Sequence, residues 1–460
     1  MSTECSTQGV LFPGVAGRDA VVQFNAGDVT SNGGVLMLDR ADRRVGLMSR
    51  FAACFRDHRD PDRVEHTARQ LVAQRVFGLC LGYEDVSDHD AVGKDPLLAA
   101  ACGKQEGALA THPTLSRLEM TRHGANAKTR YAKIEMVQER VDDLLADVFM
   151  EAKGGADPGL IVLDVDNSDV PLHGAQEGRF FHGYYGNYCY LPLYVFAGDH
   201  LLLARLQTAD GDPARHVVAE LKAVVSRLKR KWPRAKILVR GDSGFCREEL
   251  MAWCEAAGHF YVIGMARNER LEAHVADALA EAKSRHETSG RAERVFRDFD
   301  WTTVKSWSRA RRVVAKAEHL VGGKSNPRFV VTNLPRRSWA AKRLYEELYC
   351  ARGEAENRIK EQQLGLFGTR LSTPTLQGNA VRMAMSAMAY VLTCALRRLG
   401  LAGTEMENAQ ADTIRLRLLR IGALVRITAR KIWVSMSASW PWRDLFESCA
   451  ARLLAPAHVT

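Results

Sequence analysis

The sequence is poor in proline and has no paired cysteine motif. Proline accounts for only 14 of the 460 residues, against 36 glycines. None of the ten cysteines stands in a Cys-x-x-Cys arrangement, and most lie within apolar stretches. This pattern argues against a zinc site or a disulfide scaffold, and we expect reduced core thiols in a cytosolic protein.

Long hydrophobic runs are also missing. The longest uncharged apolar stretch, residues 383–396 between Arg382 and Arg397, is shorter than the ~20 residues that a membrane span needs. It predicts a buried helix. The first 18 residues contain Glu4 and no basic segment before an apolar run, so we expect no secretory signal, no membrane partner and a cytoplasmic location.

Motifs for nucleotide binding and for several hydrolase classes are absent. Gly323-Lys324-Ser325 resembles the end of a phosphate-binding loop, but Glu318 stands where the first glycine is required. No Gly-x-Ser-x-Gly, His-Glu-x-x-His or Gly-x-Gly-x-x-Gly pattern occurs. We therefore expect no nucleotide cofactor.

The chain does have an excess of positive charge. It has 64 Lys and Arg against 54 Asp and Glu, a net charge of +10 and a pI near 9.1, which suits a polyanionic partner such as nucleic acid. A hydrophobic content of 46% is that of a globular protein. A chain of this length has room for two or three domains.

Residues 1–153 are predicted to be mainly helical. Apolar periodicity predicts helices there, and the glycine-rich segment 154–159 ends the pattern. The capped segment around Pro113 is consistent with a DNA-reading helix pair, and equally with an ordinary capped helix. The helices are expected at residues 35–45, 46–55, 63–81, 90–102 and 127–153.

Residues 154–400 are predicted to form an α/β domain with a mixed sheet covered by helices. Strands are expected at 160–165, 184–196, 200–207, 236–240 and 260–265, and helices at 213–231, 247–257, 338–363 and 376–399. A strand-rich insertion at about 290–335 contains strands at 295–303, 311–320 and 329–334. The tail, 401–460, has strands at 425–428 and 433–436 and a helix at 442–453.

Three acids stand where two predicted strands end. Asp164 and Asp166 are two residues apart on a buried strand, so they point to the same face. Asp242 follows the strand at 236–240 in a Gly-Asp-Ser-Gly turn. Two neighbouring strands that end in acids can build a divalent-cation site. Taken alone, either acid could instead cap a turn.

A further group of polar residues lies on a predicted helix. Tyr349, Arg352, Glu356 and Lys360 are spaced by three or four residues and so share one helix face. Such a stripe is a poor core face and suits the wall of a site. A solvated helix with an ordinary ion pair between Arg352 and Glu356 would show the same pattern.

The sequence resembles the DDE transposases of bacterial insertion sequences, in the IS4-like group and most closely the IS1380 family. The resemblance covers nearly the whole chain. It is found in Phe24-Asn25-Ala26-Gly27-Asp28, in Arg75-Val76-Phe77-Gly78, in Gly82-Tyr83-Glu84-Asp85, in Pro113-Thr114-Leu115-Ser116-Arg117 and from Leu172-His173-Gly174 to Gly198.

The most specific match is the family signature of Tyr, two residues, Arg, three residues and Glu, at Tyr349, Arg352 and Glu356. The signature normally ends in a Lys seven residues after the Glu. Gln363 stands at that position here, and Lys360 is the candidate substitute.

By the same resemblance, the first acid is Asp166, which precedes a hydroxyl residue, Ser168, by two, with Asp164 as the alternative. The second acid is Asp242. The resemblance also implies an RNase H-like core with a β insertion, preceded by a mainly helical region at 1–153 for DNA binding and assembly.

The implied function is cut-and-paste transposition. Three carboxylates, Asp166, Asp242 and Glu356, can hold two Mg²⁺ ions for phosphodiester cleavage and strand transfer, and Mn²⁺ should substitute because all ligands are oxygen. Tyr349, Arg352 and Lys360 are expected to contact DNA. The expected partners are the terminal inverted repeats and target DNA, with a homodimer in a synaptic complex near the bacterial nucleoid.

Two other functions fit the same residues. One is a decayed transposase that binds DNA ends without catalysis, and the other is a stand-alone metal-dependent nuclease that never joins strands. Two basic clusters support DNA binding in each case. They lie at residues 227–236 and at Lys305, Arg309, Arg311 and Arg312 beside Trp301 and Trp307.

Overall fold

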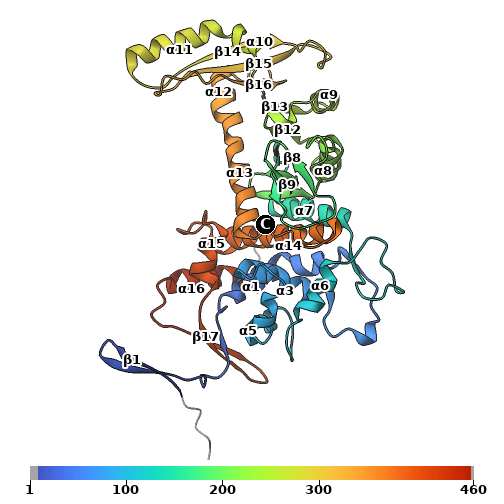
Figure 1. Ribbon diagram of the computed structural model, residues 1–460, viewed down its shortest axis with the longest axis vertical. Helices are drawn as coiled ribbons and strands as arrows, with labels where there is room; N and C mark the ends of the chain where they lie inside the picture. Colours follow the sequence, from blue (N-terminus) through green and yellow to red (C-terminus); the bar gives the residue numbers. More distant parts are fainter. Residues whose placement is uncertain (1–8, 457–460) are drawn as a thin grey trace, which may run out of the picture. The chain divides into compact units, whose positions relative to one another are not determined.

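The computed structural model describes residues 9–456, so Cys5 and the predictions about the first eight residues lie outside the described part (Figure 1). The chain forms two compact units. Unit 1 contains residues 1–48, 64–116 and 395–460, and unit 2 contains 49–63 and 117–394. The predicted limits at 153 and 400 stay a prediction, because a division by packing does not test where DNA binding and catalysis occur.

Unit 2 is built on a mixed sheet of eight strands, which confirms the predicted α/β class with a mixed sheet. The strand order is β11-β10-β6-β12-β13-β16-β15-β14. β12 is parallel to β6 and to β13, whereas β10 is antiparallel to β6. The bounds of the first five are β6 Leu160–Asn167, β10 Leu193–Ala197, β11 His200–Arg205, β12 Lys236–Gly241 and β13 Phe260–Met265.

The strand-rich insertion continues this sheet. β16 (Arg328–Thr332) pairs antiparallel with β13, and β15 (Arg311–His319) joins β16 to β14 (Glu293–Trp301). The three strands agree with those predicted. Two helices that precede them were not predicted, α10 (Glu269–His274) and α11 (Ala276–Ser289).

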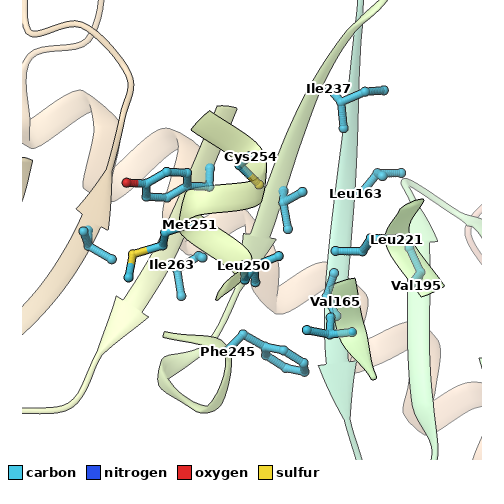
Figure 2. Close-up of a cluster of buried hydrophobic side chains, with 14 of the residues drawn as sticks. Leu163, Val165, Val195, Leu221, Ile237, Phe245, Leu250, Met251, Cys254 and Ile263 are labelled. Carbon is cyan, nitrogen blue, oxygen red and sulfur yellow. The ribbon is translucent and has the colours of Figure 1, made fainter. Parts of the chain in front are cut away.

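Alternation along the strands divides the core between the two faces of the sheet. Figure 2 shows Leu163 and Val165 of β6 packed with residues of α8 and α9, including Leu221 and Leu250. This face is covered by helices whose bounds are α7 Gln138–Ala152, α8 Val217–Lys231, α9 Glu248–Ala256, and α10 and α11. Because side chains alternate, Asp164 and Asp166 point to the opposite face.

The opposite face is covered by a long helical segment and by α14. The segment runs without a break from α12 (Ala341–Arg343) to η5 (Glu361–Gly365), close to the predicted 338–363. A π-helical stretch, η3 (Leu344–Tyr349), and a 3₁₀ turn, η4 (Cys350–Arg352), precede α13 (Gly353–Lys360). The side chains of Leu344 and Leu348 pack on Leu238 and Val262 of the sheet.

The helix α14 (Leu376–Leu396) confirms the predicted buried helix. Within the described residues it is the one helix that, extended to Leu401, is long and apolar enough to cross a membrane by length and composition. However, 83% of its most apolar window is buried inside the protein. The ring of Tyr390 packs edge-on against Phe196 of β10, with centroids 5.8 Å apart.

A small three-stranded sheet interrupts the predicted strand 184–196. Its order is β7-β9-β8, with bounds β7 Val170–Pro171, β8 Phe180–His182 and β9 Asn187–Tyr190. Within the predicted range, residues 184–186 form the turn after β8, and the strand is divided into β9 and β10 at residues 191–192. The predicted helix 127–153 is also wrong in its first third, because β5 (Ile134–Met136) pairs there with β4 (Phe55–Asp57).

Unit 1 combines the start and the end of the chain. β3 (Val29–Thr30) pairs with β17 (Ala423–Ile427), which pairs with β18 (Ile432–Met436). Gly34 approaches this C-terminal segment so closely that an added Cβ would lie 1.7 Å from the Leu418 carbonyl oxygen. The remaining elements that lie wholly in unit 1 are β1 Val10–Val15, β2 Arg18–Val22, α1 Val35–Val45, α3 Ala68–Leu81, α4 Asp88–Val92, α5 Pro96–Ala101, η6 Arg397–Leu401, α15 Ala411–Ile414, η7 Arg415–Leu419 and α16 Arg443–Leu454.

Two short helices lie at the limits of the units, α2 (Leu47–Ala52) and α6 (His112–Glu119). Six of the nine described cysteines are buried, and none of the nine forms a disulfide. Cys350 is exposed and departs from the predicted core position.

Candidate active site

The two acids of β6 have different surroundings. Asp164 lies beside Arg240 of β12, whose Nη2 donates to Asp164 Oδ2 at 2.8 Å. Arg240 Nη1 also donates to the Leu348 carbonyl at 2.6 Å. Burial raises the pKa of the Asp164 carboxyl, while the Arg240 guanidinium opposes that shift. Asp164 is thus part of a buried ion pair that joins two strands to the helical segment.

Asp166, two residues further along β6, faces the candidate site. Its side chain is 13% exposed, its Oδ1 accepts from the Asn167 amide at 3.0 Å, and its Oδ2 accepts from Arg352 Nη1 at 3.0 Å. Burial raises its pKa to about 7; Arg352 opposes this shift, and the negative charges of Asp242 and Glu356 add to it. The three acids therefore lie close enough to interact.

Asp242 stands directly after β12, the parallel neighbour of β6. The register pairs Gly241 with Val165, so Asp242 and Asp166 follow at the same edge of the sheet. Asp242 Oδ1 accepts from the Gly244 amide at 2.9 Å and so caps a short 3₁₀ turn, η2 (Ser243–Phe245). The side chain therefore caps a turn and also lies beside the other acids.

Glu356 reaches the site from α13. Arg352, one turn earlier, donates from Nη2 to Glu356 Oε1 at 2.5 Å while its Nη1 holds Asp166. One guanidinium thus bridges an acid of the sheet and an acid of the helix. The helix-face prediction for Arg352 and Glu356 agrees with this geometry, although Arg352 lies in the 3₁₀ turn η4.

Tyr349 packs over Gly264 of β13. A Cβ added at Gly264 would lie 2.4 Å from Tyr349 Oη and 3.0 Å from the Ser243 amide nitrogen. Burial raises the pKa of Tyr349, and the negative charge of Asp242 contributes to the shift. The Tyr349 hydroxyl thus lies near Asp242, in space that a side chain at position 264 would fill.

Lys360 and Gln363 differ from the expected basic contact. Lys360 is exposed at the end of α13. Within residues 9–456 it forms no hydrogen bond or ion pair with Asp166, Asp242 or Glu356. Gln363 is buried; its Oε1 accepts from Ser168 Oγ at 3.0 Å, and its Nε2 has no partner among the described atoms. The structure therefore brings together Asp166, Asp242, Glu356, Arg352 and Tyr349, and leaves Lys360 apart.

The donor set suits a hard divalent cation, because all three side chains are carboxylates. Among the described residues, however, no three His, Cys, Asp or Glu side chains are arranged to hold a metal ion. The guanidinium of Arg352 pairs with both Asp166 and Glu356 and supplies positive charge to their carboxylates.

Part of the basic clusters predicted from sequence is engaged in packing. Arg311 is buried and donates to both Glu248 and Glu255 of α9. Lys231 donates to the Met150 carbonyl of α7 at 2.7 Å. Trp301 and Trp307 are partly buried against the core beneath the insertion. These side chains hold the insertion and α8 in place, whereas Arg230, Arg234, Lys236 and Lys305 are exposed, and their contact with DNA stays a prediction.

The profile of the family described as "Transposase DDE domain group 1" matches residues 12–457. The chain belongs to this family. It is thus a DDE transposase, a class of enzyme that cleaves DNA. The family match spans both units, including the helical segment with Arg352 and Glu356.

Among solved structures, the transposase matches a piggyBac transposase in a synaptic complex with hairpin DNA. The two share 10% identity with a TM-score of 0.41, over 92% of this chain and 82% of the other. No curated protein matches the sequence. A likeness at this level assigns no residue role to this DDE transposase.

Sequence reasoning missed several residues of the site. Arg240 was assigned only to a strand, although a basic residue beside a buried acid on a parallel neighbour signals an ion pair. Gly264, inside the apolar strand 260–265, gave a further signal, because glycine in a strand marks a close approach. Ser168 was used only as a motif residue, and its bond to Gln363 could not be predicted.

Proposed function

We propose that Asp166, Asp242 and Glu356 are the catalytic acids of a transposase that cuts and rejoins the ends of an insertion sequence. The observation that supports this is the Arg352 bridge between Asp166 and Glu356, with Asp242 close enough to raise the pKa of Asp166. Asp166 is 13% exposed and Glu356 42%, and carboxylates this close repel one another unless a cation neutralises them. That repulsion is the reason for proposing a metal.

Asp166, Asp242 and Glu356 would hold two Mg²⁺ ions, and Mn²⁺ would substitute since every ligand is an oxygen. The chemistry supplied there is activation of a water or a 3′-hydroxyl and stabilisation of the leaving oxygen. The burial of Asp166 would exclude bulk water from its side of the site.

Arg352, Tyr349 and Lys360 are proposed as DNA contacts. When the acids bind metal, the Arg352 guanidinium becomes available for a phosphate oxygen near the scissile bond. Tyr349 Oη would hydrogen-bond or stack on DNA beside Asp242. Lys360, exposed one turn after Glu356, would take the basic role that the family assigns to the position of Gln363.

We propose an RNase H-like catalytic core for residues 154–400, with the β insertion at about 290–335. The order β11-β10-β6-β12-β13, with β10 antiparallel, supports this proposal. The finer family assignment to IS1380, the homodimer in a synaptic complex and the cytoplasmic, nucleoid-associated location are proposed on the resemblance alone.

DNA-end binding and assembly are proposed for residues 1–153, of which 1–48 and 64–116 belong to unit 1 together with the 401–460 tail. A groove in unit 1 supports DNA binding, because Lys94, Lys104, Arg430 and Lys431 line it, against the acids Asp28 and Glu106. Such a groove suits the phosphate backbone of a duplex.

A cleavage assay tests the proposed function. The substrate is a labelled duplex made from the DNA that flanks the gene, incubated with Mg²⁺, Mn²⁺ or EDTA. Asp242→Asn and Glu356→Gln should each reduce cleavage at least about a hundredfold. Mutation of a residue that only hydrogen-bonds to a metal ligand usually costs about 10- to 100-fold in activity, and loss of the ligand itself should cost more. Glu354→Gln, an exposed acid two residues from Glu356 on α13, is the matched control.

The products separate the candidate functions. Joined strands in the wild type support a transposase, whereas hydrolysis without joining would favour the stand-alone nuclease. Binding of the duplex with no cleavage under any of these conditions would favour the non-catalytic end-binding protein.

A further inference from the structure

A hairpin of unit 2 exposes a cluster of aromatic rings. β8, β9 and the turn between them have the sequence Phe-Phe-His-Gly-Tyr-Tyr-Gly-Asn-Tyr over residues 180–188. Tyr184 is 87% exposed, Phe181 57% and Tyr188 46%; Phe180 and Tyr185 are also exposed. Exposed rings at this density are costly in water and mark a binding surface. We call these five residues the aromatic hairpin.

The aromatic hairpin is tied directly to the strand of Asp166. β7 begins four residues after Asp166, and β10, which follows β9, pairs Tyr194 with Asp166. Asn187 Nδ2 donates to Asp169 Oδ2 at 3.5 Å, so the turn of the hairpin contacts the segment that leaves β6. β8, β9 and α13 all belong to unit 2. The rings therefore lie beside the candidate acids.

Electrostatics support this proximity and restrict the ligand. Burial raises the pKa of the Tyr185 hydroxyl to about 12, and the negative charges of Asp169 and Asp166 contribute to this shift. Unless a metal ion neutralises them, the same charges would repel a phosphate. A neutral, flat group such as a nucleobase would not be repelled and would gain the stacking energy of the rings.

The composition of the hairpin also favours bases. Residues 180–188 contain no Lys or Arg to follow a phosphate backbone, and no Leu, Ile, Val or Met of the kind that fills a protein interface. The rings present both faces and edges, since Phe181 and Tyr188 meet at 73° and Tyr184 and Tyr185 at 88°. Arg179 alone adds a cation, packed 4.7 Å from the Tyr188 ring centre.

We propose that the aromatic hairpin stacks on unpaired bases of the DNA end next to the candidate active site. This inference rests on the proposed function, because it needs a DNA strand at the three acids. Bases inside a duplex are already paired and stacked on one another, so exposed rings gain contact with unpaired bases. The hairpin would thus hold the cut end in position for joining.

The test uses the full-length protein and two DNA probes with 2-aminopurine at the terminal nucleotide. One probe is a duplex with a short unpaired overhang, and the other is a blunt duplex. The double variant Phe181→Ala with Tyr184→Ala should bind the overhang probe about tenfold more weakly and lose the quenching of 2-aminopurine. Affinity for the blunt duplex and its salt dependence should not change, because no charge is removed.

Two control variants accompany this test. Phe181→Tyr with Tyr184→Phe keeps both rings and should restore binding and quenching. Tyr131→Ala removes a ring that is 62% exposed elsewhere in unit 2 and should have no effect. Wild-type affinity for the overhang probe in the alanine variant would overturn the inference, as would an equal loss on the blunt duplex. Loss of self-association in that variant, with overhang binding retained, would also overturn it and assign the hairpin to a second copy of the chain.

Asp242→Asn separates this inference from the proposed function. That variant should retain the quenching while it loses cleavage. If the wild type binds and quenches the overhang probe but never cleaves DNA, the proposed function fails and the stacking site stands. If cleavage is normal and quenching is absent, only the stacking site fails.

Discussion

At the level of single residues, Arg240 distinguishes the two acids of β6, because it forms an ion pair with Asp164 and not with Asp166. The spacing of Asp164 and Asp166 predicts that both point to one face, and they do. Sequence could not separate them, because the partner of Asp164 comes from a strand 76 residues further along the chain. A buried acid with a bidentate guanidinium partner is stabilised as a pair, and breaking such a pair usually costs about 3–5 kcal/mol.

Gly264 provides the prediction at this scale. Gly264→Ala should lower DNA cleavage about tenfold or more, because the new Cβ would displace Tyr349 Oη or the Asp242 turn, and misplacement by about 1 Å costs up to about a hundredfold. The measurement is the initial rate of cleavage together with the thermal unfolding midpoint. Gly322→Ala, where no atom lies within 4 Å of the added Cβ, is the control. Full activity in Gly264→Ala would show that Tyr349 has no positional role.

At the level of elements, local patterns predicted the helical segment but not its irregular turns. The apolar spacing of 338–363 is typical of a helix, yet π-helical stretches enclose the turn with Arg352. Such turns often occur at functional sites. Their hydrogen bonds depend on packing against the sheet, so no residue pattern encodes them. The join between β13 and β16 was unpredictable for the same reason, since it pairs residues about 70 positions apart.

Contacts of helices α3 and α4 in unit 1 give a structural role to Arg75, the first residue of a motif shared with the transposase family. The buried Arg75 of α3 donates to the Glu84 carbonyl at 3.2 Å and lies 3.2 Å from His89 Nε2. It therefore links the Arg75-Val76-Phe77-Gly78 motif to the Gly82-Tyr83-Glu84-Asp85 turn. Burial, together with the charge of Arg75, lowers the pKa of His89 to about 3.

This histidine predicts a pH dependence of stability. Unfolded His89 titrates near its ordinary pKa of about 6.5, so below that pH the unfolded chain binds a proton that the folded chain excludes. The free energy of unfolding should therefore fall by about 1.4 kcal/mol per pH unit from about 6.5 towards 3. Urea denaturation of the wild type and His89→Gln at pH 7 and pH 5 measures this. An equal fall in both proteins would contradict the assignment.

At the level of the whole molecule, the three regions predicted along the sequence differ from the two units in which the chain packs. The C-terminal segment belongs to unit 1, where β17 pairs with β3. Composition predicted a globular, basic chain, and the family motifs identified the transposase class. The partition into units could not be predicted, because strands of two to five residues separated by about 400 positions leave no periodic signal.

The central claim is that Asp166, Asp242 and Glu356 form one metal site, now bridged by Arg352. Binding of Mn²⁺ to the DNA-free protein, followed by electron paramagnetic resonance, tests it most directly. Asp166→Asn, Asp242→Asn and Glu356→Gln should each weaken Mn²⁺ binding at least about tenfold, whereas Glu354→Gln should bind as the wild type does. Wild-type Mn²⁺ affinity in Asp242→Asn and Glu356→Gln would contradict the account.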